Sequence, residues 1–272
     1  DPSITTLKPH PGQIESVNNL NKILEESEIT LSHENCNKVQ DPYSLRCVPQ
    51  VHGAIRQTIN HAEEVLNIEL NSVTDNPLVF VDEKKVVSGG NFHGEALALS
   101  MDYLAMGISE IANISERRIE KMMNPTFSDL PAFLIESSGL NSGLMIAHVT
   151  AAAIASENKY LCHPASVDSI PTSTDKEDHV SMGVTSGLKL QTVIENTKNC
   201  LAIELLCACQ ALEFQRPLRA SRAVELVHQH IRKKVKPLTE DRVLSGDIKI
   251  IYDLITSEEL TLLVEERIGE LS

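Results

Sequence analysis

The sequence predicts a mainly α fold, a bundle of long helices with one small β-hairpin. Apolar residues recur at helical spacing over three long stretches, near 49–70, 94–123 and 177–214. By contrast, the short segment 78–87 has two β-prone runs around a polar turn. The chain has 272 residues, of which 42% are hydrophobic, so it is long enough to bury a substantial core. Long helices with wide apolar faces are typical of bundles.

Turn and capping residues support the order of the elements. Pro49 suits the start of a helix, and Pro125 ends one. The segment 162–175 is rich in Pro, Ser and Thr, which is typical of a loop. In chain order we predict a helix over 14–24, a loop over 30–48, a helix over 49–70, strands over 78–81 and 86–87, a helix over 94–123, a loop over 124–141, a helix over 142–161, a loop over 162–175, a helix over 177–214, and tail helices near 220–235 and 257–268.

We divide the chain at the end of the third long stretch. Residues 1–215 form the helical-bundle portion, and residues 216–272 form peripheral C-terminal helices. The wide apolar faces require cover from several sides, and some of that cover is expected from other subunits.

Composition excludes several classes of function. A net charge of −14 argues against binding to nucleic acid or to an anionic membrane, since both need clustered Lys and Arg. The basic cluster 232–236 is interpreted as a solvated helix C-terminus. No apolar run approaches the roughly 18 residues of a membrane span. The six cysteines form no C-x-x-C pair and no signal peptide is visible, which favours free thiols and a cytoplasmic protein.

The octet 40–47 combines a carboxamide, a phenol and a guanidinium ahead of a long helix. Arg46 offers a planar fork for a carboxylate, Tyr43 a phenolic donor or proton carrier, and Gln40 both a donor and an acceptor. Such a trio suits the carboxylate of an amino acid. Taken alone, the octet is also compatible with an ordinary polar loop.

Together with later motifs, the octet resembles the aromatic amino-acid ammonia-lyase and aminomutase family. The resemblance runs through nearly the whole chain and includes the segments 49–53 (PQVHG), 72–79 (SVTDNPLV), 89–95 (GGNFHGE), 115–118 (SERR), 139–143 (GLNSG), 156–159 (SENK), 163–169 (HPASVDS) and 177–183 (EDHVSMG). It implies a homotetramer whose active sites draw residues from several subunits.

One expected motif is missing. Members of the family make an electrophilic 4-methylideneimidazol-5-one (MIO) group from an internal Ala-Ser-Gly, and this chain contains no such tripeptide. The chain also opens at Asp1 without an initiator Met. We therefore interpret it as the C-terminal half of such an enzyme, inactive alone, whose partner is the N-terminal half that supplies the MIO group.

The resemblance also assigns roles to single residues. It makes Arg46 the carboxylate anchor, places Tyr43 and Gln40 beside the electrophile, and places Phe92 near the MIO ring and the substrate. Glu177 is expected to bind an imidazole N–H, whereas phenylalanine-specific relatives typically have Gln there. Structural roles stay open for two of these residues: Phe92 also suits a core position, and Glu177 a helix N-terminal position that the macrodipole stabilises.

The implied reaction is elimination of ammonia from L-histidine to give trans-urocanate. The alternatives are an ammonia-lyase or aminomutase acting on tyrosine or phenylalanine, or an inactive helical fragment or subunit. A metal site is not expected, because the ten histidines show no H-E-x-x-H pattern. His93 and Glu95 are interpreted as structural support beside Phe92, and 116–118 (ERR) as helix-surface or intersubunit ion pairs.

Overall fold

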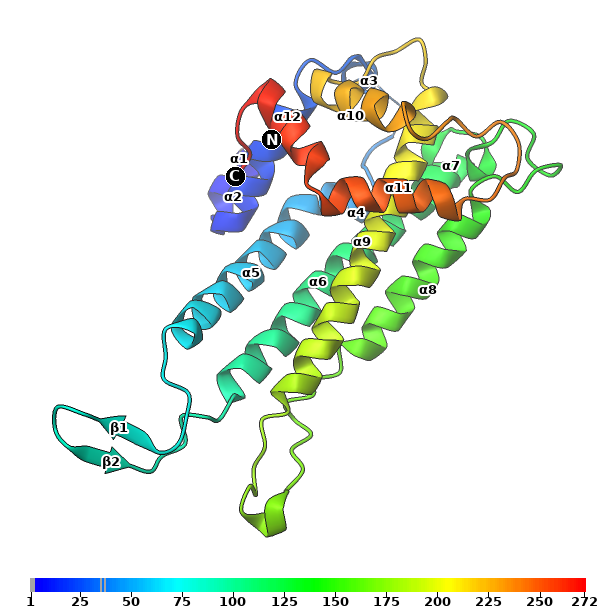
Figure 1. Cartoon of the computed structure of the whole chain (residues 1–272). Coiled ribbons are helices and arrows are strands. Elements are labelled where there is room, and N and C mark those ends of the chain that lie inside the picture. Colours follow the sequence, from blue (N-terminus) through cyan, green and yellow to red (C-terminus); the bar gives the residue numbers. More distant parts are fainter. Residues whose placement is uncertain (1–2, 35, 37) are drawn as a thin grey trace.

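The computed structural model describes residues 3–34, 36 and 38–272, which fold into a helical bundle with one hairpin (Figure 1). The elements are α1 (Ser3–Leu7), α2 (Pro11–Leu24), α3 (Glu28–Ser32), α4 (Tyr43–Arg46), α5 (Val48–Leu70), β1 (Leu78–Phe80), β2 (Lys85–Val87), α6 (Glu95–Met123), α7 (Pro125–Ser128), a 3-10 turn η1 (Ala132–Leu134), α8 (Met145–Leu161), a second 3-10 turn η2 (Ser173–Asp175), α9 (Gly183–Glu213), α10 (Arg222–Arg232), α11 (Ser245–Thr256) and α12 (Glu259–Ile268). The predicted mainly α fold is confirmed.

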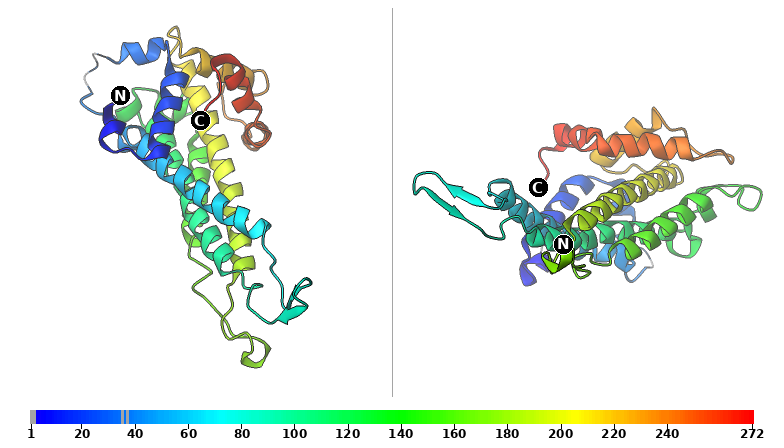
Figure 2. Two further views of the ribbon diagram at one scale, coloured as in Figure 1. Left: turned by 90° about the vertical axis from the view of Figure 1, so that its left-hand side faces the viewer. Right: turned by 60° about the horizontal axis from the view of Figure 1, so that its bottom comes forward.

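Four long helices lie side by side and form the body of the molecule. Helix α6 packs most extensively against α9 and also contacts α5 and α8. Figures 1 and 2 show that α1 to α3 and α10 to α12 gather at one end of this bundle, while the hairpin and the η2 loop project from the other. The two ends of the bundle therefore carry different sets of candidate site residues.

The main core lies where α6, α8 and α9 meet the C-terminal helices. Ile119, Leu134 and Ile203 are almost completely buried in it. The same core contains Ile231 of α10 and Ile251 of α11, which come from beyond the division at 215/216. The tail thus shares one core with the bundle, and the two-part division stays a prediction about folding units.

Helices α5 and α6 agree closely with their predicted bounds. Pro49 stands in the first turn of α5, where its missing N–H costs nothing. Asn124 has extended backbone angles at the end of α6, and Pro125 begins the short α7. The hairpin is also confirmed, with β1 and β2 antiparallel and Leu78 opposite Val87.

The last long helix begins later than predicted, and this difference concerns a site residue. Helix α9 starts at Gly183 instead of near residue 177. The Thr172 N–H donates to the Glu177 carbonyl at 3.0 Å, and Met182 adopts a left-handed conformation with φ of 60°. Because these contacts close a loop, the helical pattern of 177–182 is not realised as helix.

Helix α8 likewise begins at Met145 instead of near 142. The backbone N–H groups of Ser142 and Gly143 each donate to the Asp241 carboxylate at 2.9 Å, which holds these residues in a turn. Gly143 has φ of +56°, and a Cβ there would lie 2.5 Å from the Phe133 carbonyl oxygen. Only glycine fits this turn without strain.

Several short helices and one longer helix were not predicted. Helices α3 and α4 lie at and within the predicted loop over 30–48, and α3 is capped by the Ser27 side chain, which accepts from the Thr30 N–H at 3.2 Å. Helix α11 carries many β-branched residues, which weakened its helical signal. Its packing against α9 stabilises it in spite of this.

Candidate active site

Gln40, Tyr43 and Arg46 lie together at one end of the bundle. Helix α4 begins after Pro42, whose extended backbone turns the chain into a single helical turn. The Arg46 Nη1 donates to Gln40 Oε1 at 2.8 Å, and the guanidinium carbon lies 4.6 Å from the centre of the Tyr43 ring. Tyr43 is 72% exposed. The trio therefore presents an accessible fork, held by an amide and an aromatic face, to any carboxylate that approaches.

Phe92 and Glu177 lie on two loops at the opposite end of the bundle. Phe92 is 56% exposed and lines two hollows. One, of about 350 Å³, also contains Leu66 and Leu70 of α5. The other, of about 620 Å³, contains Met101 of α6 and the segment 180–185 that leads into α9. An exposed aromatic face between two hollows is able to stack on a planar group.

Glu177 lies in the loop before α9, after the end of η2 and away from the N-terminus of α9. The macrodipole acts within the first turn of a helix, and α9 begins six residues after Glu177. The interpretation of this carboxylate as a helix N-terminal acid is therefore wrong. The Phe92 and Glu177 loops are tied together nearby, because the His93 Nε2 lies 2.9 Å from the His179 carbonyl oxygen.

The two groups of site residues do not meet within one chain. Arg46 lies two residues before α5, whereas Phe92 lies beside the other end of that helix. The 23 residues of α5 span about 35 Å at 1.5 Å per residue. A substrate the size of an amino acid therefore cannot touch both groups within one copy of the chain.

A third cluster was not anticipated from sequence. His93 and Glu95, interpreted as structural support, are joined by His179 from the loop before α9. The Glu95 Oε2 lies 4.0 Å from His93 Nδ1 and 3.8 Å from His179 Nε2. The spacing His93-x-Glu95 gave a weak local signal, but His179 lies in a loop far along the chain from His93.

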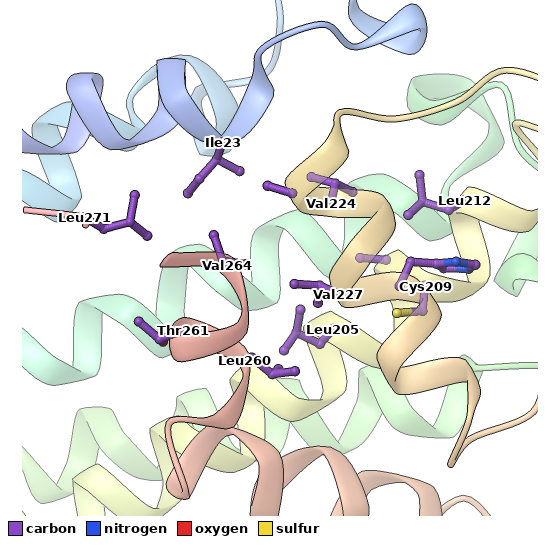
Figure 3. A pocket seen from close by; sticks show the side chains of 13 residues that line it. Ile23, Leu205, Cys209, Leu212, Val224, Val227, Leu260, Thr261, Val264 and Leu271 are labelled. Carbon is purple, nitrogen blue, oxygen red and sulfur yellow. The ribbon is translucent and has the colours of Figure 1, made fainter. Parts of the chain in front are cut away.

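Another pocket lies elsewhere and is lined almost entirely by apolar side chains (Figure 3). It occupies about 420 Å³ where α2, α9, α10 and α12 meet, and side chains such as Ile23, Leu205, Val227 and Leu260 surround it. An amino-acid carboxylate would lose its hydration there without a matching charge, which is costly. This pocket does not suit a zwitterionic substrate.

Buried charges connect the long helices. Arg118 of α6 pairs with Glu204 of α9, with Nη2 2.9 Å from Oε2, and Glu116 contacts His148 Nε2 of α8 at 2.9 Å. Arg117 of this triplet is half exposed and pairs with Glu116, whereas the side chains of Glu116 and Arg118 are largely shielded from solvent. The interpretation as helix-surface pairing is therefore wrong for Glu116 and Arg118, and the intersubunit alternative stays a prediction. Burial lowers the pKa of the nearby His52, and the positive Arg118 lowers it further, so this imidazole is neutral at neutral pH.

Comparison with known proteins identifies the family. The family described as "Aromatic amino acid lyase" matches residues 1–233. The chain belongs to the aromatic amino acid lyase family. Among its curated relatives in this family, histidine ammonia-lyase of Myxococcus xanthus is 51% identical over 259 residues, which cover 95% of this chain and 51% of the relative.

Solved structures of aromatic amino acid lyases share the fold. Histidine ammonia-lyase from Trypanosoma cruzi superposes with a TM-score of 0.90 at 49% identity, over 98% of this chain and 50% of that one. Phenylalanine aminomutase of Pantoea agglomerans superposes with a TM-score of 0.86 at 31% identity, over 94% of this chain and 53% of that one. The chain thus spans about half the length of these relatives. None of the helices in the described part of the chain is long and apolar enough to cross a bilayer.

Proposed function

We propose that this chain contributes substrate-binding side chains to an enzyme that eliminates ammonia from L-histidine to give trans-urocanate. The observation that carries the proposal is the assembled trio of Gln40, Tyr43 and Arg46, in which the guanidinium is already oriented by an amide and a phenol ring. The high identity to histidine ammonia-lyases over nearly the whole chain supports the substrate.

The reaction makes separate demands that these side chains meet. Loss of the β-proton leaves an electron pair that forms the Cα–Cβ double bond as the amine departs. Arg46 binds the substrate carboxylate through two parallel hydrogen bonds and so fixes the Cα–Cβ bond in the site. The Tyr43 hydroxyl lies within the same group and is available to carry a proton. The base that removes the β-proton is expected from outside this chain.

Glu177 is the proposed determinant for an imidazole side chain. A carboxylate accepts a hydrogen bond from the imidazole N–H and favours the protonated ring. Phe92 offers an exposed aromatic face that fits a flat five-membered ring, such as imidazole or the MIO group. The MIO group, when present, captures the substrate amine and so makes it a better leaving group. We propose that the half of the enzyme outside this chain supplies it, because this chain has no Ala-Ser-Gly.

The separation of the two residue groups supports an assembly with shared sites. Arg46 of one copy and Phe92 of another have to come together, since about 35 Å of α5 separates them within one copy. A homotetramer with sites built from several subunits is the assembly we propose. The six free cysteines support the proposed cytoplasmic location, because reduced thiols persist there.

The proposal is tested by restoring the missing part. The chain is co-expressed with the part of the Myxococcus xanthus relative that it does not cover, and urocanate formation from L-histidine is followed by ultraviolet absorbance. Activity is expected from the combination and not from the chain alone. A folded, stable combination that leaves L-histidine unchanged would contradict the proposal. Activity of the chain alone would contradict the proposed external source of the electrophile.

The second candidate is an ammonia-lyase or aminomutase acting on phenylalanine or tyrosine. It is favoured by the strong superposition on phenylalanine aminomutase and on the tyrosine aminomutase of Streptomyces globisporus, with TM-scores of 0.86 and 0.88. A third candidate is a helical subunit or fragment without activity, to which a failure of the restored combination would point.

The exchange Glu177→Gln distinguishes the first two candidates. Loss of a charge-assisted hydrogen bond to imidazole costs about 1.5–3 kcal/mol, so kcat/KM for L-histidine is expected to fall about ten- to a hundredfold in the restored enzyme. The ratio of phenylalanine to histidine turnover is expected to rise. The neighbouring exchange Asp178→Asn serves as the control. Unchanged histidine kinetics in Glu177→Gln would remove Glu177 from substrate recognition.

A further inference from the structure

Two histidines and a glutamate converge between the loop before α6 and the loop before α9. One nitrogen of His93, one of His179 and one carboxylate oxygen of Glu95 all lie within 4.8 Å of one another. The two imidazole rings are nearly parallel, with centres 5.7 Å apart and an interplanar angle of 7°. Within the part of the chain that the structure describes, this is the group of potential ligands compact enough to hold a metal ion.

The hydrogen bonding of His93 prepares it as a ligand. Its Nε2 lies 2.9 Å from the His179 carbonyl oxygen, which accepts a hydrogen bond and therefore fixes the proton on Nε2. The lone pair of Nδ1 is then directed to the Glu95 side, 4.0 Å from Oε2. Metal-binding histidines commonly donate their second ring N–H to a carbonyl in this way, which fixes both tautomer and ring orientation.

The surroundings of the Glu95 carboxylate support a cation at this cluster independently. Glu95 Oε2 is buried, and no residue that the structure describes donates a hydrogen bond to it. A buried carboxylate oxygen without a donor costs free energy, so it calls for a cation or another donor. The two imidazoles face it, at 4.0 Å from His93 Nδ1 and 3.8 Å from His179 Nε2.

The ligand set matches the chemistry of zinc. Two imidazoles and one carboxylate are a known set for Zn²⁺ with an open fourth position, and bonds of about 2.0–2.1 Å place tetrahedral ligands about 3.3 Å apart. The observed separations are longer than this, at 3.8 and 4.0 Å from Glu95 Oε2 and within 4.8 Å for all three ligand atoms. Small side-chain rotations close that gap, since His179 is largely exposed and free to adjust.

We propose that His93, Glu95 and His179 form a binding site for a divalent transition-metal ion of the zinc class. The ion would clamp the loop that carries Phe92 to the loop that carries Glu177, because His93 follows Phe92 directly and His179 lies two residues after Glu177. Metal binding would therefore hold both loops in a fixed position. It rests on geometry alone and does not depend on the proposed reaction.

Metal binding is measured directly on the purified chain. After treatment with a chelator and dialysis, the protein is titrated with ZnCl₂ by calorimetry and with CoCl₂ by visible absorption. One ion per chain is expected, with a Co²⁺ spectrum typical of tetrahedral nitrogen and oxygen ligands. Zinc is also expected to raise the thermal unfolding midpoint, because an ion that binds only the folded state stabilises it.

Matched variants assign the ion to this cluster. His179→Ala and Glu95→Gln are each expected to weaken zinc binding by about a hundredfold or more and to abolish the thermal shift. The control is His163→Ala, which alters an exposed histidine paired with Asp168, at 3.5 Å. Circular dichroism verifies that all variants are folded. The proposal is overturned if the chain binds no zinc, or if the three variants bind it equally.

Discussion

At the scale of single residues, Arg46 is the side chain on which the proposed chemistry depends most. Its guanidinium donates a hydrogen bond to Gln40 Oε1 and contacts the Tyr43 ring. This orientation lowers the entropy that is lost when a carboxylate binds, since the long side chain is already ordered. A lysine could not replace it, because an ammonium lacks the planar fork.

Replacing Arg46 by alanine tests its role as carboxylate anchor. In the restored enzyme, kcat/KM for L-histidine is expected to fall about thirtyfold to several thousandfold. This corresponds to a rise of about 2–5 kcal/mol in activation free energy. Steady-state kinetics measure the loss. The exposed Arg267→Ala, on α12, is the control and is expected to keep full activity. Near-normal kinetics in Arg46→Ala would remove this residue from the site.

Asp102 shows how one buried carboxylate makes stability depend on pH. Burial alone would raise its pKa, but hydrogen bonds donated to the carboxylate outweigh this, among them the Ser166 N–H at 2.8 Å. The pKa of Asp102 therefore lies below its ordinary value of about 3.9. A carboxyl of this kind stabilises the fold above its unfolded pKa, and that stability is lost as pH falls through the folded pKa.

The exchange Asp102→Asn is expected to lower stability at neutral pH and to reduce its acid dependence. Asparagine still accepts from Ser166 but lacks the charge, so part of the roughly 1.5–3 kcal/mol of a charged hydrogen bond is lost. Urea unfolding from about pH 7 down to about pH 3 measures both effects. The difference between the two proteins should shrink toward low pH. A constant difference over that range would show that ionisation of Asp102 does not matter.

At the scale of elements, two glycines permit the close contact of α2 with α5. A Cβ at Gly53 would lie 2.5 Å from the backbone nitrogen of Gln13, and one at Gly12 would overlap the Gly53 carbonyl. The two helix backbones touch here, which larger residues at either position would prevent. This contact joins the N-terminal helices to the start of α5, close to Arg46.

Alanine at Gly53 is therefore expected to destabilise the protein. Overpacking at a close helix contact typically costs about 1–3 kcal/mol, which exceeds the gain in helix propensity of about 1 kcal/mol. The control is Gly246→Ala in α11, where no atom lies within 4 Å of the added Cβ. This variant is expected to be neutral or slightly more stable. Chemical denaturation distinguishes the two, and equal stabilities would contradict the close-packing argument.

At the scale of the whole molecule, apolar side chains remain exposed along the bundle. Val149 of α8 is 55% exposed, and Leu188 of α9 is 61% exposed. Contiguous apolar surface on a long helix is typical of an interface. For the proposed enzyme, the distance between the Arg46 and Phe92 groups gives the same indication, because one substrate cannot reach both groups within one copy.

The chain is expected to self-associate in solution. Light scattering coupled to size-exclusion chromatography should give a mass several times the 30.0 kDa of one chain. Leu188→Glu places a charge on the apolar face and is expected to lower that mass, because burying an unpaired charge is costly. Val243→Glu, at an exposed position in the loop before α11, is the control. A monomer in the unmodified protein would contradict this expectation.

Local signals in the sequence determined much of this fold. The periodic apolar residues of α5 and α6, together with Pro49 and Pro125, set their positions almost to the residue. The hairpin followed from β-prone runs around a polar turn. The trio of Gln40, Tyr43 and Arg46 was also predictable, because a short stretch of local chain brings them together.

Tertiary structure alone decided the start of α9, the helix α11 and the cluster of His93, Glu95 and His179. The pattern of 177–182 is helical, but the hydrogen bond from Thr172 to Glu177 and the left-handed Met182 hold it as a loop. Helix α11 exists because α9 covers its apolar face. His179 joins His93 because two loops meet at one end of the bundle. Contacts between residues far apart in the chain leave no periodic or spacing signal, so only the packed fold reveals them.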